Sequence, residues 1–295
     1  MVMKEQSERT RFRRGLSETF FAWLRTGPGQ ALVDIFKQHH LDVRLRGNYL
    51  NAYDAQCSLA RVQWTRRGGA SLVIHKAYLH DSPLSQQPNL NRERNPYARF
   101  AVTLEFVRHY ADALPKIREL VSDRYVQPEG KWEEECSRAY LEGTPLLVID
   151  RQIVSGRPST RLDILAMSGV DSTPFMVAVE LKRDLDNRIK DVPQQTANYL
   201  RMLDPNGEGL REDIARSYVD VCRQLRALGF KAPDPELVRP GMRVAGLVAL
   251  ANYNEKSKLL AMAFAEARKL DREIKFCKLG KDDLVLPAET EWISP

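Results

Sequence analysis

The 295-residue sequence predicts a two-domain α/β protein, with a mixed central sheet in residues 129–295 and a separate α+β domain in residues 1–128. Three observations lead to this fold class. The apolar run FMVAVELK at 175–182 is typical of a strand buried on both faces of a sheet. Strand and helix patterns alternate after residue 145, whereas three strand-like segments precede a long helical pattern before residue 128. The residues Pro128-Glu129-Gly130 are the expected joint.

In the N-terminal part, residues 30–36 predict a short helix, and 101–125 predict one or two helices. Strands are expected where aromatic and β-branched residues gather, and the polar, proline-containing stretch 80–99 is expected to be a loop. The expected strands are 41–50, 57–66 and 70–79, and Arg66-Arg67-Gly68-Gly69 is expected to be the hairpin turn between the last two.

The C-terminal part is expected to begin with a helix over 131–142 and a strand over 145–154. Two further strands, 161–167 and 175–182, are separated by a turn-forming segment and predict a hairpin. A helix over 192–203 should follow, with Asp191 as a plausible N-cap and Pro193 in its first turn.

The remaining residues predict a helical insertion at about 204–240 and then a return to the sheet. The insertion contains a helical pattern at 210–228 and a proline-rich connection at 231–240. The return consists of a strand at 243–250, a helix at 258–270 and a last strand at 273–279. This order predicts an α/β sandwich around a mixed sheet.

The strand at 175–182 carries two charged residues, Glu180 and Lys182, at its end. Alternate strand residues share a face, so these two side chains should point the same way, and Asp163 on the neighbouring strand should converge on Glu180. Two carboxylates and a backbone carbonyl suit Mg²⁺, and a lysine beside them can orient or deprotonate a water. A lone Glu-x-Lys is usually an ordinary surface pair, but the apolar surroundings here argue against that interpretation.

Gln195 and Tyr199 are four residues apart on the helix that follows, so they share one face. Because the helix directly follows the strand of Glu180 and Lys182, this face should overlook the charged group. An ordinary polar helix face is the alternative.

Together, Asp163, Glu180-x-Lys182 and Gln195-x-x-x-Tyr199 resemble the PD-(D/E)XK superfamily of restriction-endonuclease-like nucleases, with a QxxxY helix like that of its RecB-type branch. The stretches RLDILA and VAVELKRD are most similar to the nuclease domains of NucS/EndoMS-type enzymes. Leu162 stands where the family usually has proline. The resemblance covers residues 130–280 and implies an αβββαβ core.

The resemblance implies a metal-dependent DNA endonuclease of repair, restriction or phage defence. Asp163, Glu180 and the Leu181 carbonyl would bind Mg²⁺, or Mn²⁺ in its place, and Lys182 would position or activate water. Gln195 and Tyr199 would orient the lysine, the water or the substrate, and Arg161 and Arg183 would hold phosphates. The first helix would add an acidic residue, for which Glu135 is preferred over Glu133 and Glu134.

Four alternatives to a DNA endonuclease acting alone remain open. A catalytically idle scaffold could bind nucleic acid or assemble with other proteins, and an enzyme on the same core could act on RNA or nucleotides. A homodimer is plausible because a double-strand cut needs two sites, and an activating protein partner is plausible as well.

Composition sets outer limits. The net charge of +6 makes the chain only mildly basic. Arg66, Arg67 and the other N-terminal arginines could contact nucleic acid, and the alternative is that they lie in ordinary solvated loops. No apolar run approaches the length of a membrane span, so a cytoplasmic protein without membrane association is expected. Four scattered cysteines argue against a zinc site or a disulfide framework.

Overall fold

A computed structural model gives the fold and describes residues 12, 14–54, 57–65, 68–80, 82–86, 95–125, 146–154, 161–168, 173–183, 188–251, 254, 256–280 and 287–295. It is a mixed α/β protein with two five-stranded sheets. The described residues fall into two compact units. The N-terminal unit lies within Arg13–Glu134 and Arg223–Lys231, and the C-terminal unit lies within Met1–Phe12, Glu135–Cys222 and Ala232–Pro295.

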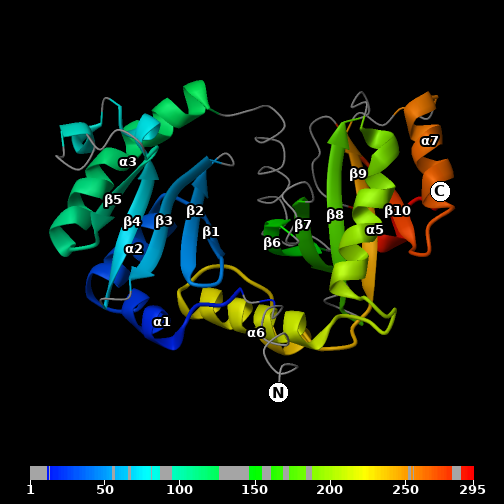
Figure 1. The fold of residues 1–295 in the computed structure, drawn as a ribbon, viewed down its shortest axis with the longest axis horizontal. Coiled ribbons are helices and arrows are strands. Elements are labelled where there is room, and N and C mark those ends of the chain that lie inside the picture. Colours follow the sequence, from blue (N-terminus) through cyan, green and yellow to red (C-terminus); the bar gives the residue numbers. More distant parts are fainter. Residues whose placement is uncertain are drawn as a thin grey trace, which may run out of the picture. The chain divides into compact units, whose positions relative to one another are not determined.

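The sheet of the N-terminal unit is an antiparallel meander in which neighbours in sequence are neighbours in space (Figure 1). Its register aligns a buried row across all five strands, formed by Leu45, Leu50, Val62, Leu72 and Phe100. One face of the sheet is therefore a continuous apolar surface. The strands are β1 (Asp42–Leu45), β2 (Tyr49–Asp54), β3 (Cys57–Thr65), β4 (Gly69–His75) and β5 (Tyr97–Ala101).

Three helices cover that apolar face: α1 (Glu18–Leu24), α2 (Gly27–Gln38) and α3 (Leu104–Arg124). Phe106 of α3 stacks on Phe100 with ring centroids 5.0 Å apart, and Phe20 of α1 stacks on Trp64 at 5.7 Å. Thr103 and Ser17 cap α3 and α1 by accepting backbone N–H groups. Residues 104–124 form a single helix with Pro115 inside it, which resolves the expectation of one or two helices.

Three expectations for this unit were wrong. Residues 41–50 are not one strand, because Gly47 adopts a φ of 65° and turns the chain between β1 and β2. The strand expected to end at residue 79 ends at His75, whose ring accepts the Ala77 N–H and begins the short 3₁₀ helix η1 (Lys76–Leu79). Residues 80–99 contain the 3₁₀ turn η2 (Pro83–Gln86) and most of β5, whose alternating burial was hidden by its polar flanks.

The sheet of the C-terminal unit has the order β10-β9-β8-β7-β6. Strands β6 (Leu146–Val154), β7 (Arg161–Ser168) and β8 (Phe175–Arg183) pair antiparallel, and β9 (Val244–Ala251) and β10 (Ile274–Leu279) continue parallel to β8. The expected hairpin of the two segments around Asp163 and Glu180 and the mixed sheet are confirmed. Residues 175–182 of β8 are buried throughout, as expected of a central strand.

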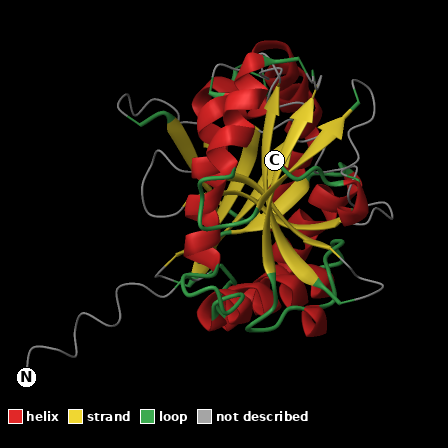
Figure 2. Ribbon diagram, turned by 90° about the vertical axis from the view of Figure 1, so that its right-hand side faces the viewer, coloured by secondary structure: helices red, strands yellow, loops and turns green. Residues whose placement is uncertain are grey.

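Helices α5 (Val192–Leu203) and α7 (Lys258–Ala267) pack on one face of this sheet (Figures 1 and 2). Phe264 of α7 meets Phe276 of β10 edge to face at 4.5 Å, which anchors α7 there. The expected insertion contains α6 (Glu212–Ala227) and the 3₁₀ turn η5 (Pro235–Leu237), and η6 (Glu289–Glu291) lies near the C-terminus.

Asp191 occupies the N-cap position of α5, but its side chain makes no capping hydrogen bond. The preceding residues already turn in the 3₁₀ helix η4 (Ile189–Asp191), so Asp191 has a helical backbone conformation that is unsuited to the usual cap. Along the described residues, no helix is both long enough and apolar enough to cross a membrane.

Candidate active site

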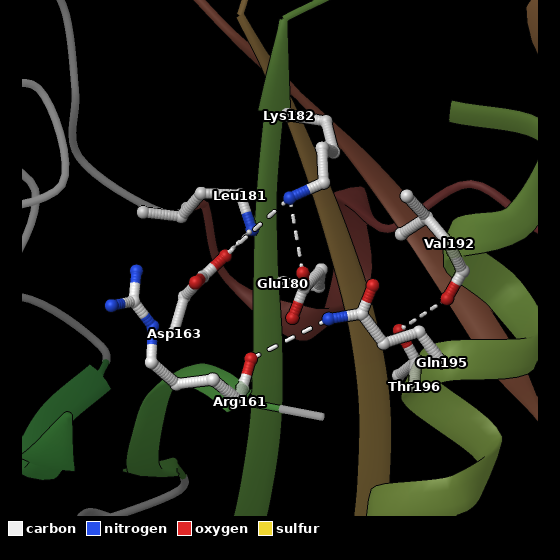
Figure 3. A network of polar contacts seen from close by, with 8 residues as sticks. All are labelled: Arg161, Asp163, Glu180, Leu181, Lys182, Val192, Gln195 and Thr196. Carbon is white, nitrogen blue, oxygen red and sulfur yellow. Dashed lines mark hydrogen bonds and ion pairs between the residues drawn. The ribbon is translucent and has the colours of Figure 1, made fainter. Parts of the chain in front are cut away.

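The site is built where the pairing of β7 with β8 stops. The ladder runs from Ser168↔Phe175 to Ile164↔Val179, and Asp163 is the next residue of β7. Its carboxylate accepts the Leu181 backbone N–H at 2.9 Å (Figure 3). The Asp163 side chain therefore replaces a backbone hydrogen bond between β7 and β8, and the regular pairing of the two strands ends at this carboxylate.

Glu180 and Lys182 project from β8 on the same face, as the strand period predicts. The Lys182 ammonium lies 3.0 Å from Glu180 Oε1 and 3.9 Å from Asp163 Oδ2, so it lies between the two carboxylates (Figure 3). Glu180 is 1% exposed, and Asp163 and Lys182 are each 8% exposed. Burying three charges is costly, and mutual neutralisation is what makes this arrangement tolerable.

Helix α5 brings two further predicted residues to the same place. The Gln195 side-chain amide donates to the Arg161 carbonyl at 3.4 Å, which joins α5 to the first residue of β7 (Figure 3). Tyr199, one turn later, is fully buried. Its hydroxyl forms no hydrogen bond of standard geometry within the described residues. Gln195 is the polar side chain that most lowers the pKa of this hydroxyl.

The electrostatics of the site keep Tyr199 protonated. Burial raises the pKa of its hydroxyl far above the usual tyrosine value, and the Gln195 contact opposes this shift in part. The carboxylates of Glu180 and Asp163 raise the pKa of Tyr199 further. The Tyr199 hydroxyl therefore remains available as a hydrogen-bond donor.

Close packing of α5 on the sheet positions Gln195 and Tyr199. Gly246 of β9 lies under the helix, and a Cβ there would come within 3.0 Å of Thr196 and 3.1 Å of Leu200. Gly246 pairs with Ala178, two residues before Glu180 on the same face. Two small residues in adjacent strands thus create the space that α5 fills. Sequence reasoning missed Gly246; its signal is a single glycine inside the apolar run VAGLVALA.

The donor set fits a hard divalent cation. Asp163 and Glu180 offer two carboxylates. In an extended strand the carbonyl of a residue faces the same neighbouring strand as its N–H, and the Leu181 N–H donates to Asp163. Within the described ranges, no three side chains of His, Cys, Asp or Glu gather in one place.

Six of the predicted site residues therefore lie together: Arg161, Asp163, Glu180, Leu181, Lys182 and Gln195 (Figure 3). Tyr199, one turn after Gln195 on α5, is near enough to this group for Gln195 and the two carboxylates to shift its pKa. Arg161 is exposed at the start of β7. Arg183 is the last residue of β8, but its side chain is not among those that the structure describes. Glu135, Arg66 and Arg67 lie outside the described residues. Sequence reasoning missed the Leu181 amide and the Arg161 carbonyl, because backbone groups carry no residue signature.

Comparisons of the chain with protein-family models, with curated proteins and with solved structures found no match.

Proposed function

We propose that the protein is a metal-dependent phosphodiesterase that hydrolyses DNA as an endonuclease. One observation carries the proposal: a buried Asp163–Glu180–Lys182 cluster occupies the opened end of the β7–β8 hairpin under the Gln195 and Tyr199 face of α5. Buried charges cost stability, so their concentration at the end of two inner strands favours a functional over a structural role.

The order of elements supports the same proposal. Strands β6, β7 and β8 form an antiparallel meander, α5 follows, and β9 adds parallel to β8. This is the strand–strand–strand–helix–strand order that the resemblance to the restriction-endonuclease-like core implies. The fold alone would not specify an activity, so the side chains carry the functional argument.

In this proposal Asp163, Glu180 and the Leu181 carbonyl hold Mg²⁺, for which Mn²⁺ can substitute. The bound cation supplies positive charge beside the phosphoryl oxygens. Lys182 would position the attacking water or, once it has lost its own proton to solvent, accept the proton of that water as the water oxygen bonds to phosphorus. The P–O ester bond would break, and the leaving oxygen would take a proton from solvent. Tyr199 and Gln195 donate hydrogen bonds to the water or to a phosphate oxygen, and Arg161 holds a neighbouring phosphate.

The direct test is cleavage of labelled duplex, single-stranded, branched and mismatched DNA, and of RNA, with Mg²⁺, Mn²⁺ or EDTA. Wild type should cut DNA only with metal, and Asp163→Asn and Lys182→Met should each lose about 100-fold or more in rate. The matched control is Asp271→Asn, which removes an exposed carboxylate paired with Arg201 and should keep wild-type cleavage.

An idle binding scaffold would give a different result. It would cut nothing in the panel and would bind DNA equally well with or without Asp163. Metal-dependent cutting of RNA alone would contradict the DNA assignment while leaving the phosphodiester chemistry in place. Repair, restriction and phage defence are the proposed settings, with a homodimer or an activating protein as proposed partners.

A further inference from the structure

The face of the N-terminal sheet opposite its helices carries an unusual set of side chains. In an antiparallel sheet, one face commonly packs on the core and the other meets water. Next to the buried row described above, the register aligns Arg44, Asn51, Arg61, Val73 and Arg99, one from each strand. Three of the five positions in this row are arginines.

Aromatic and amide side chains surround two of these arginines. The Arg61 guanidinium lies 5.6 Å from the ring centre of Tyr49 and 5.6 Å from that of Tyr97. The Arg99 guanidinium donates to Ser71 Oγ at 3.1 Å and to Gln63 Oε1 at 3.2 Å. We call Tyr49, Arg61, Gln63, His75, Tyr97 and Arg99 the arginine–tyrosine face.

The charge on this face is not neutralised locally. Arg61 and Arg99 contact rings, a hydroxyl and an amide, and within the described residues neither forms an ion pair with a carboxylate. Asp42, on the same side of the sheet, is paired with Arg44 at 2.7 Å. A face kept for solubility alone would normally mix charges of both signs.

The face is also accessible. Tyr97 is 46% exposed and Arg99 is exposed, whereas Tyr49, Arg61, Gln63 and His75 are partly exposed. His75 packs edge to face on Tyr97 with ring centroids 5.3 Å apart, which fixes the orientation of the tyrosine ring. Flat rings and a planar guanidinium are thus held in place on a sheet, with unpaired positive charge between them.

We infer that the arginine–tyrosine face binds a single-stranded segment of nucleic acid. Unpaired bases present flat surfaces that stack on Tyr97, Tyr49 and the Arg61 plane, and phosphates accept from Arg99 and Arg61. Duplex bases are already stacked on one another and cannot use such a surface. This binding would add the form of the substrate, a strand with unpaired bases, to the proposed function. Only the role of the face in substrate binding rests on that function.

The test measures binding in EDTA, so that it does not depend on cleavage. The full-length protein is titrated against a dye-labelled oligothymidine of about 16 nucleotides, the oligouridine of equal length and a duplex. Arg61→Gln/Arg99→Gln should weaken binding to both single strands about tenfold or more and reduce the salt slope by about two. The matched control, Arg108→Gln/Arg124→Gln, removes two exposed arginines from α3 and should change neither quantity.

Tyr97→Ala keeps the test valid if the arginine pair is needed for folding, because Tyr97 is exposed. It should weaken single-strand binding about fivefold or more with an unchanged salt slope. Equal losses in the control pair, unchanged binding in Tyr97→Ala, or duplex bound as tightly as single strand would each overturn the inference. Face-dependent binding without any cleavage would contradict the proposed function alone, and cleavage without face-dependent binding would contradict this inference alone.

Discussion

In the proposed function, Lys182 is the residue on which the chemistry of the site depends. Its ammonium lies between Glu180 and Asp163 in a place from which water is largely excluded. A lysine in that position performs the electrostatic task of a bound cation, because it holds two carboxylates near each other. In the proposed function, a bound cation would take over this task from the lysine.

Replacing Lys182 with methionine should therefore destabilise the metal-free protein. Two buried carboxylates would lose their positive partner, at a cost of about 3–5 kcal/mol in the free energy of unfolding. Added Mg²⁺ should restore much of that loss by binding the folded state. Thermal unfolding of wild type and Lys182→Met in EDTA and in Mg²⁺ measures both effects. Equal melting temperatures in EDTA would mean that the carboxylates do not rely on the lysine.

At the residue scale, the side chains of the site were predictable and its backbone groups were not. The Glu180-x-Lys182 spacing follows from the strand period, and Asp163 could be placed because the hairpin was recognised. The hydrogen bond from Leu181 to Asp163 depends on where the β7–β8 ladder ends, and no residue type signals that point. The burial of Tyr199 also escaped prediction, since a tyrosine at a helix position is compatible with either a buried or a wet face.

At the scale of elements, apolar periodicity located most of the strands and helices. Residues 243–250 and 192–203 were expected as a strand and a helix, and β9 and α5 lie within one residue of those bounds. Errors gathered in the N-terminal sheet, where short polar strands carry a weak signal. Gly47 ended one expected strand, and YARFA at 97–101 was hidden in a polar stretch.

The approach of α5 to the sheet gives a test at this scale. Gly246→Ala would place a methyl group 2.9 Å from Ile274 Cδ1 and close to Thr196 and Leu200, so α5 or its neighbours must move. Overpacking of this kind costs about 1–3 kcal/mol. Because Thr196 follows Gln195 in the same helix, we expect cleavage to fall as well.

Gly69→Ala is the matched control, because a Cβ at Gly69 meets nothing within 4 Å. Chemical denaturation and cleavage rates of the two variants should separate them clearly. Wild-type stability and rate in Gly246→Ala would show that α5 is not held by this contact.

The whole molecule contains buried tyrosines in both units. Burial raises the pKa of Tyr110 in the N-terminal unit and, as the largest contribution, that of Tyr199 in the C-terminal unit. Tyr110 is fully buried, and its hydroxyl has no hydrogen-bond partner within the described residues. Each unit therefore contains a buried tyrosine whose hydroxyl ionises less readily than an exposed one.

This arrangement predicts a loss of stability at alkaline pH. At neutral pH the tyrosine is protonated in both the folded and the unfolded state, so the raised pKa does not change the free energy of unfolding. As the pH rises through about 10, the unfolded tyrosine ionises while the folded one does not, and the folded protein becomes less stable. Tyr110→Phe, which removes the buried phenol hydroxyl, should reduce this decline. Denaturant unfolding at several pH values between neutrality and pH 11 checks the difference. Equal alkaline declines in wild type and Tyr110→Phe would contradict the account.

At this largest scale the sequence predicted two units but not how the chain is shared between them. Residues 223–227 are the last part of α6, yet together with residues 228–231 they belong to the N-terminal unit. The buried hydrogen bonds between Gln224 and the Leu16 backbone, at 2.8 and 2.9 Å, connect segments about 200 residues apart. Local patterns cannot report such a contact, because they carry no information on distant partners.

The most direct test of the central claim is an anomalous-scattering map from crystals of the wild-type protein grown with Mn²⁺. A Mn²⁺ peak is expected at the carboxylates of Asp163 and Glu180, with the Lys182 ammonium displaced from Glu180, and Asp163→Asn should lose that peak. A map without a peak at these carboxylates, with the Lys182–Glu180 ion pair intact, would contradict the central claim.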